Sequence, residues 1–203
     1  MKLDSQSFQN GQPIAAEFAA GDASGFAGNR NPQLAWSDVP AGTRSFALIC
    51  VDPDVPTVAE LVGRDDVSIP LDQPRADFVH WVMVDVPAEL REIAAGSCSD
   101  GFTAHGKTQP AGPAGARQGI NDYTGWFAGN AQMSGTYFGY DGPYPPFNDE
   151  RLHRYFFRLF ALDVERLPVD GAFTAADVHR AMQGHVLAEA SVHGTYTLNK
   201  ALA

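Results

Sequence analysis

The stretch Ser45-Phe-Ala-Leu-Ile-Cys-Val51 decides the fold of this chain. It is apolar at both odd and even positions, so both faces of an extended strand in this place would be buried. We therefore expect this strand to lie at the centre of a sheet. Cys50 lies inside it, where a buried and unreactive thiol is the expected state.

Two further apolar runs, residues 78–86 and 154–162, are rich in Val, Phe and Leu, as strands are. The 20 glycines and 14 prolines divide the chain into short pieces of this kind. Only residues 174–190 have the pattern of a helix, with Thr174 as the N-cap and apolar residues at every fourth position. The tail, residues 192–198, alternates enough to form a final strand. The sequence therefore predicts an all-β fold with a minor helix.

Residues 1–203 are expected to form one domain, because 44% of them are hydrophobic and only 19% are charged. The formal charge of -10 disfavours nucleic acids and anionic bilayers as partners. We expect no transmembrane segment, because no run approaches the roughly 18 apolar residues that a span needs. The N-terminus lacks the pattern of a signal peptide and the two cysteines lie in unrelated contexts, so the expected location is cytoplasmic.

The turn Asp52-Pro-Asp-Val-Pro56 follows the central strand directly. Prolines on both sides of Asp54 fix the backbone and stiffen the turn. Two aspartates, Asp52 and Asp54, on a rigid turn at the end of a strand are well placed for a pocket. A solvated Asp-Pro turn is the alternative interpretation of this segment alone.

Two histidines lie in otherwise apolar strands. Alternation puts His80 on the same face as the valines that follow it, and puts His153 beside Tyr155, about 7 Å away along the strand. A buried histidine needs a hydrogen-bond partner or stays neutral at some cost. Each histidine alone is most simply a satisfied core residue. Together with the two aspartates of the turn, they form a candidate site.

Three kinds of chemistry suit this set of side chains. Two histidines and two aspartates can bind a transition metal, but the compact spacings of metal motifs are absent. A His-Asp pair can activate a serine or a water, but no nucleophile motif is present. An anion site needs donors, which a histidine held protonated by an aspartate, a tyrosine hydroxyl and glycine-loop amides supply. We therefore expect an anion pocket that uses no metal and no cofactor.

Short motifs along the chain occur in a characteristic order. They are Asn31-Pro-Gln-Leu-Ala-Trp36, Asp52-Pro-Asp-Val-Pro56, Phe78-Val-His-Trp-Val-Met-Val84, Asn121-Asp-Tyr123, Gly139-Tyr-Asp-Gly-Pro143 and His153-Arg-Tyr-Phe-Phe157. In this order they resemble the phosphatidylethanolamine-binding protein (PEBP) family, and most of all its bacterial Raf-kinase-inhibitor-like branch, of the YbhB/YbcL type. The resemblance extends from about residue 28 to residue 188, which is most of the chain.

The resemblance implies an antiparallel β-sandwich of the Greek-key type, with a large central sheet and short C-terminal helices. It also implies a ligand that carries a phosphate or a carboxylate, such as a phospholipid head group or a phosphorylated side chain, and a role as a regulator of a kinase or a protease. A cofactor-free, hydrolase-like enzyme that uses the same His and Asp residues is the alternative, although a non-catalytic binding protein is preferred. The ligand-binding residues carried over are Asp52, Asp54, Pro56, His80, Gly142, His153 and Tyr155.

Residues 124–138 depart from the family pattern, because typical members need only a few residues between the neighbouring motifs. This aromatic-rich insertion is expected to cap one end of the sandwich, to lie at the pocket rim, or to form an interface in a homodimer. Its large apolar residues are Trp126, Phe127, Met133, Tyr137 and Phe138.

Overall fold

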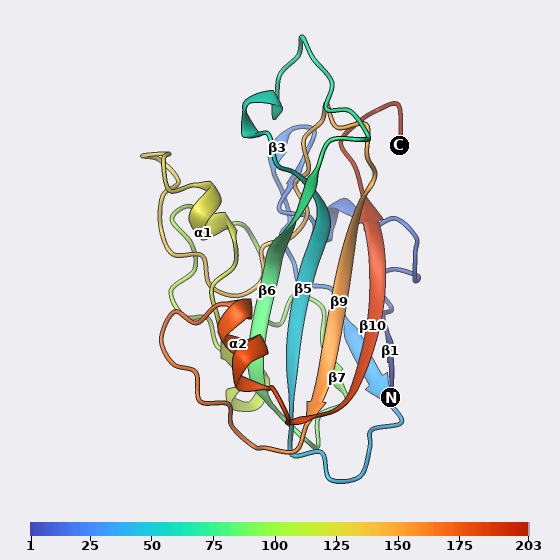
Figure 1. Cartoon of the computed structure of the whole chain (residues 1–203), viewed down its shortest axis with the longest axis vertical. Helices are drawn as coiled ribbons and strands as arrows, with labels where there is room; N and C mark the ends of the chain where they lie inside the picture. Colours follow the sequence, from blue (N-terminus) through green and yellow to red (C-terminus); the bar gives the residue numbers. More distant parts are fainter. Residues whose placement is uncertain (203) are drawn as a thin grey trace.

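The structure is a computed structural model that describes residues 1–202. Its largest sheet has five antiparallel strands in the order β10-β9-β5-β6-β8 (Figure 1). The predicted central strand is confirmed, because β5 pairs with β6 on one side and with β9 on the other. The five strands are β5 (Ser45–Pro56), β6 (Arg75–Pro87), β8 (Arg117–Gln118), β9 (His153–Leu162) and β10 (Val186–Tyr196).

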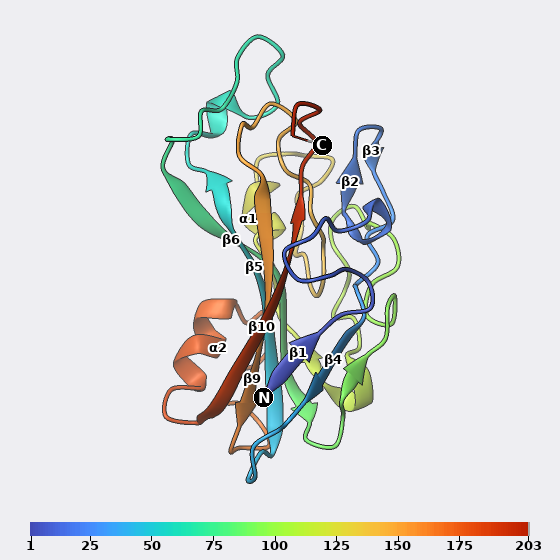
Figure 2. The same cartoon turned by 90° about the vertical axis from the view of Figure 1, so that its right-hand side faces the viewer.

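A smaller antiparallel sheet, in the order β1-β4-β7, packs on one face of the large sheet (Figure 2). One apolar core joins Leu34 and Trp36 of the small sheet to Phe46, Trp81 and Phe157 of the large sheet. The predicted β-sandwich with a large central sheet is therefore confirmed. The remaining strands are β1 (Lys2–Asp4), β4 (Leu34–Ser37) and β7 (Glu92–Ile93), with β2 (Gly21–Asp22) and β3 (Gly25–Phe26) in a separate hairpin.

Helix α2 (Ala175–Ala181) covers part of the opposite, outer face of the large sheet (Figure 2). Val178 and Met182 pack there against Ile49 and Val82, in a second apolar core. Within residues 1–202, no helix is long and apolar enough to cross a lipid bilayer. The other helices are α1 (Tyr123–Trp126) and the 3-10 turns η1 (Ala16–Phe18), η2 (Ala59–Leu61) and η3 (Pro113–Gly115).

The helix predicted over residues 174–190 starts where expected but is wrong beyond the end of α2. It begins with a capping box, in which Thr174 and Asp177 satisfy each other's backbone N–H groups. Gly184 then adopts a left-handed conformation, with φ at 80°, in which the helix cannot continue. From Val186 the chain pairs with β9 instead, because an open sheet edge is available there. The predicted final strand therefore begins earlier than residue 192.

Candidate binding site

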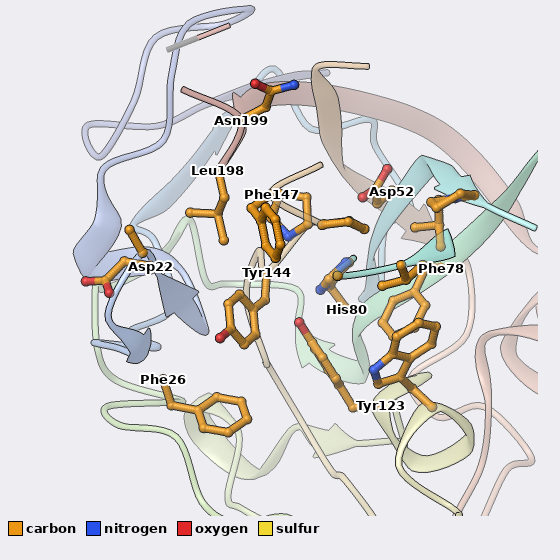
Figure 3. A pocket seen from close by; sticks show the side chains of 18 of the residues that line it. Asp22, Phe26, Asp52, Phe78, His80, Tyr123, Tyr144, Phe147, Leu198 and Asn199 are labelled. Atoms are coloured by element: carbon orange, nitrogen blue, oxygen red, sulfur yellow. The ribbon is translucent and has the colours of Figure 1, made fainter. Parts of the chain in front are cut away.

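A cavity of about 770 Å³ opens where β5 ends and where β6 and β9 begin (Figure 3). Its floor consists of Asp52 from β5, His80 from β6 and Tyr155 from β9. Because β6 and β9 both run antiparallel to β5, their first residues meet the last residues of β5 at one end of the sheet. All three residues are at most 3% exposed. Their polar groups therefore act away from bulk water.

Seven aromatic side chains line the wall above this floor, and Figure 3 shows several of them around His80. Tyr123 stacks on Phe127, with ring centroids 5.5 Å apart, and meets the ring of His80 edge-on at 5.6 Å. The C-terminal segment 198–200 also lines the cavity. The aromatic lining residues are Phe26, Phe78, Tyr123, Trp126, Phe127, Tyr144 and Phe147.

The ring of His80 is held in one orientation. Its Nδ1 lies 2.8 Å from the main-chain oxygen of Asp141, and a carbonyl oxygen can only accept, so Nδ1 carries the hydrogen. The other ring nitrogen, Nε2, has no hydrogen-bond partner in the part of the chain that the structure describes. Burial lowers the pKa of His80 in spite of the nearby charge of Asp52, so the neutral ring dominates at pH 7. In this state Nε2 is a hydrogen-bond acceptor.

Asp141 itself is fixed by a buried network. Its carboxylate accepts hydrogen bonds from Asn29 at 2.7 Å, from Asn121 at 2.8 Å and from the Lys107 ammonium at 2.6 Å. Asp141 is fully buried, and the side chain of Lys107 is 14% exposed. The network therefore sets the position of the carbonyl that orients His80.

His153 lies behind the floor, between two carboxylates. Its Nδ1 is 2.7 Å from Oδ2 of Asp52 and its Nε2 is 3.0 Å from Oδ2 of Asp149. Burial opposes the charge on this ring, but the hydrogen bonds to Asp149 and Asp52 raise the pKa of His153 to about 9. Arg75 also binds both oxygens of Asp149, at 2.5 and 3.0 Å. His153 is thus an imidazolium whose two N–H groups are both used inside the protein.

The raised pKa of His153 predicts that the protein loses stability at alkaline pH. A pKa that rises from 6.5 to about 9 on folding corresponds to about 3 kcal/mol. This contribution is complete below pH 6.5 and disappears as the pH rises through 9, because the folded state must then lose the proton that it binds more tightly. Urea unfolding curves across this range measure it. A stability that is unchanged up to pH 10 would contradict the assignment of the charge.

The hydroxyl of Tyr155 is protonated at all physiological pH values. Burial, and next the negative charge of Asp52, raise the pKa of Tyr155 well above its usual value, and a side-chain hydrogen bond to Asp52 acts in the same direction. Asp52 also accepts a hydrogen bond from the backbone N–H of Asp54 at 2.8 Å. The floor therefore holds a carboxylate that already accepts from the Asp54 N–H and from His153, beside the free acceptor on His80.

Four of the predicted site residues line the cavity: Asp52, Pro56, His80 and Tyr155. The other three, Asp54, Gly142 and His153, lie behind the lining. Their contacts show what each of them holds in place, whereas the binding roles of all seven stay predictions.

Asp54 is fully buried against arginines. Its carboxylate accepts two hydrogen bonds from the Arg154 guanidinium, at 2.8 and 2.9 Å, and a longer one from Arg151 at 3.4 Å. Burial works against ionisation, but these contacts with Arg154 and Arg151 lower the pKa of Asp54. Asp54 therefore ties the end of β5 to the start of β9.

Gly142 is required by close packing. A Cβ atom on this residue would lie 2.2 Å from the main-chain oxygen of Phe18. The carbonyl of Gly142 accepts a hydrogen bond from the hydroxyl of Tyr123 at 2.9 Å, and its N–H donates to Asn29 at 2.8 Å. Gly142 thus positions Tyr123 in the cavity wall.

The insertion, residues 124–138, contributes both to the cavity and to the core. Trp126 and Phe127 line the cavity, which agrees with a place at the pocket rim. Tyr137 is fully buried in a third apolar cluster with Ala20 and Tyr123, and Phe138 is 7% exposed. Its predicted roles as a cap of the sandwich and as an interface stay predictions.

Sequence reasoning missed several residues that shape the site. Tyr123 and Asp141 lie inside motifs that carried the family resemblance, and their place in these motifs could have marked them as site residues. Asp149, Tyr144 and Phe147 lie in the irregular segment before β9, where no periodic pattern assigns a direction to a side chain. Among residues 1–202, no group of three or more His, Cys, Asp or Glu side chains is arranged to hold a metal ion.

A β-sandwich with a buried Asp-His cluster beneath the cavity is the kind of structure that the resemblance to the phosphatidylethanolamine-binding protein family implied. The sequence pattern of the phosphatidylethanolamine-binding protein family matches residues 4–197, so the chain belongs to this family. Its similarity extends in particular to bacterial members of the YbhB/YbcL type. The UPF0098 protein of Aquifex aeolicus is 33% identical over 198 residues, which are 97% of this chain and 88% of that protein. The Escherichia coli UPF0098 protein YbhB is 32% identical and covers 97% of this chain and 100% of its own.

Solved structures agree with this assignment. The crystal structure of Escherichia coli YbcL, described as a new member of the mammalian PEBP family, superposes with a TM-score of 0.71 at 26% identity and covers 97% of both chains. A putative PEBP homologue from Chlamydia trachomatis, CT736, gives a TM-score of 0.63 at 28% identity over 96% of this chain and 95% of its own. The predicted fold and family are therefore confirmed.

Proposed function

We propose that this protein binds a small molecule whose phosphate or carboxylate head group enters the cavity above Asp52, His80 and Tyr155. The observation that carries the proposal is the orientation of His80. Its Nδ1–H is committed to the carbonyl of Asp141, which leaves Nε2 free toward a buried, ligand-sized space. A polar atom without a protein partner at the floor of such a cavity is what a ligand head group would satisfy.

The floor favours a head group that brings hydrogen-bond donors with it. Neutral His80 offers an acceptor, and the carboxylate of Asp52 is a second acceptor beside it. The wall adds the carboxylates of Asp22 and Asp65 against one ammonium, that of Lys200. A fully ionised phosphate would meet acceptors and negative charge there. A singly ionised phosphate, which keeps an O–H group, or a phosphate joined to an ammonium group, is the better match.

The family relationship supports the same ligand class. The family is described by the binding of phosphatidylethanolamine, whose head group joins a phosphate to an ammonium group. The aromatic wall would take the apolar part of such a molecule. We therefore propose phosphoethanolamine and related amphiphile head groups as the ligands to test first.

Replacement of His80 by alanine is expected to weaken phosphoethanolamine binding by about ten- to a hundredfold, because one hydrogen bond to a charged group is lost. Isothermal titration calorimetry measures the affinity, and a thermal melt verifies that the variant is folded. His179→Ala is the matched control, because His179 lies on α2, on the outer face of the sheet. Equal affinities of the native chain and the His80 variant would eliminate this floor as the binding site.

The affinity for phosphate is expected to fall as the pH rises above about 6, where phosphate monoesters lose their second proton. Methanesulfonate has no such ionisation. It should bind only below the lowered pKa of His80, where the ring itself becomes a donor. Titrations of both anions at about pH 5.5, 7 and 8.5 separate the two effects. Equal pH profiles for the two anions would contradict a proton carried by the phosphate.

The hydrolase-like alternative requires a nucleophile. In the described part of the chain, no Ser, Thr or Cys residue lines the cavity, so a water molecule activated by His80 would have to attack. Turnover of a phosphate ester that stops in the His80→Ala variant would establish the alternative.

Regulation of a kinase or a protease is a second candidate, favoured by the exposed rim. Phe26, Trp126 and Phe147 are 47%, 46% and 44% exposed at the mouth. A protein partner that covered them would close the cavity, so phosphoethanolamine should compete with it.

A further inference from the structure

The charges under the cavity floor balance one another. His153 lies between the carboxylates of Asp52 and Asp149, and Arg75 also binds Asp149. Two negative and two positive charges therefore cancel. A carboxylate has about four lone-pair sites, so Asp52 can accept more than the hydrogen bonds from His153 and from the Asp54 N–H. The floor thus offers acceptors to a ligand but no uncompensated charge.

The wall above the floor is negative. It contains the carboxylates of Asp22 and Asp65 and one ammonium, that of Lys200. Hydrogen bonds from the side chain and the backbone of Ser24 lower the pKa of Asp22, so this carboxylate is ionised at pH 7. The lining therefore has one negative charge in excess. It surrounds a space lined by aromatic side chains, whose ring faces attract cations.

Three acceptors lie together where the floor joins the wall: Nε2 of His80, the carboxylate of Asp52 and the hydroxyl oxygen of Tyr123. The Tyr123 hydroxyl donates its hydrogen to the carbonyl of Gly142 at 2.9 Å, so toward a ligand its oxygen can only accept. The rings of Tyr123 and His80 lie 5.6 Å apart, and Figure 3 shows the hydroxyl end of Tyr123 beside His80. A primary ammonium has three N–H donors and no acceptor, so it matches this set.

We propose that the cavity binds primary amines that carry an apolar chain, with the ammonium on the floor and the chain along the aromatic wall. This inference goes beyond the proposed function, because such a ligand needs no phosphate and no carboxylate. A protonated amine brings the positive charge that the lining lacks and a donor for Nε2 of His80. The cavity volume of about 770 Å³ is ample for a short-chain amine.

Hexylamine and hexyltrimethylammonium test the proposal, because they share the chain and the charge but only hexylamine has N–H donors. Calorimetry at pH 7 should show that the native chain binds hexylamine at least about tenfold more tightly, since only hexylamine can satisfy Nε2 of His80. His80→Ala, verified as folded by a thermal melt, should remove most of this difference. Equal affinities of the native chain for the two cations overturn the proposal, and so does a lack of hexylamine binding.

Asp22→Asn tests the charge of the wall, and it decides if His80→Ala does not fold. It should weaken hexylamine binding about two- to fivefold, because the lining loses one negative charge. Asp4→Asn is the matched control, since Asp4 is exposed on β1 and does not line the cavity. It should leave the affinity for hexylamine unchanged. Hexylamine binding that is as tight in Asp22→Asn as in the native chain also overturns the proposal.

Phosphoethanolamine and hexyl phosphate separate this proposal from the proposed function. If these phosphate compounds bind and hexylamine does not, the proposed function stands and the amine site is wrong. If hexylamine binds with the expected preference over hexyltrimethylammonium and neither phosphate compound binds, the amine site stands and the proposed function is wrong.

Discussion

Replacement of His153 by alanine is expected to lower the free energy of unfolding by about 3–5 kcal/mol. The substitution removes the cation between Asp52 and Asp149, both of which are 1% exposed. Asp149 keeps Arg75 as a partner, whereas Asp52 keeps only neutral donors. Urea unfolding at pH 7, followed by tryptophan fluorescence, measures the loss. The residue therefore acts mainly on the fold, and on ligand affinity through the position of Asp52.

The chain contains a matched control for this variant. His185 forms a comparable hydrogen bond to Asp163, at 2.8 Å, but both side chains are 44% exposed. Because exposed ion pairs contribute little, His185→Ala should cost less than about 1 kcal/mol. If the two histidine variants lose the same stability, the buried carboxylates do not depend on the imidazolium, and the charge assigned to His153 is wrong.

The sequence predicted which strands carry the floor of the cavity, because the apolar runs of these strands are recognisable. The apolar run at residues 45–51, which is apolar at both odd and even positions, identified the central strand, and alternation along β9 placed Tyr155 correctly. Along β6 the alternation predicted for His80 is wrong. Val82 and Val84 lie in the outer core beneath α2, whereas His80 faces the cavity beside Tyr155, because a register shift between Cys50 and Val51 adds a residue to β6 there.

Alternation along β5 would also place Asp52 and Asp54 on one face of the sheet, and this prediction fails as well. A register shift between Asp52 and Val55 adds a bulge to β5. Asp54 therefore contacts Arg154, on the face away from the cavity.

The partners of the floor residues could not be predicted in the same way. Asp149, which holds His153, and Asp141, which holds His80, lie in irregular segments whose direction depends on contacts far away in the sequence. Asp141, for example, is bound by Asn29, which is 112 residues away. The end of α2 was misjudged for a related reason, since pairing with β9 overrides the helical pattern after Gly184.

Replacement of Asp141 by asparagine is expected to lower the free energy of unfolding by about 3 kcal/mol or more, although the two side chains have nearly the same shape. The new amide would present a donor where the carboxylate accepts from Asn29, Asn121 and Lys107. The ammonium of Lys107, whose side chain is 14% exposed, would lose its only ion-pair partner in the described chain. Urea unfolding measures the stability, and calorimetry with phosphoethanolamine measures the affinity.

A double-mutant cycle separates the buried charge from the position of the backbone. Lys107→Met removes the ammonium, so Asp141→Asn should cost clearly less in that background than in the native chain, with a difference of at least about 1 kcal/mol. Ligand affinity should behave differently. The main-chain carbonyl of residue 141 orients His80, so any shift of this loop weakens binding even where the charge has been balanced. Equal costs of Asp141→Asn in the two backgrounds would mean that the ion pair contributes nothing, and that the asparagine side chains alone hold the loop against His80.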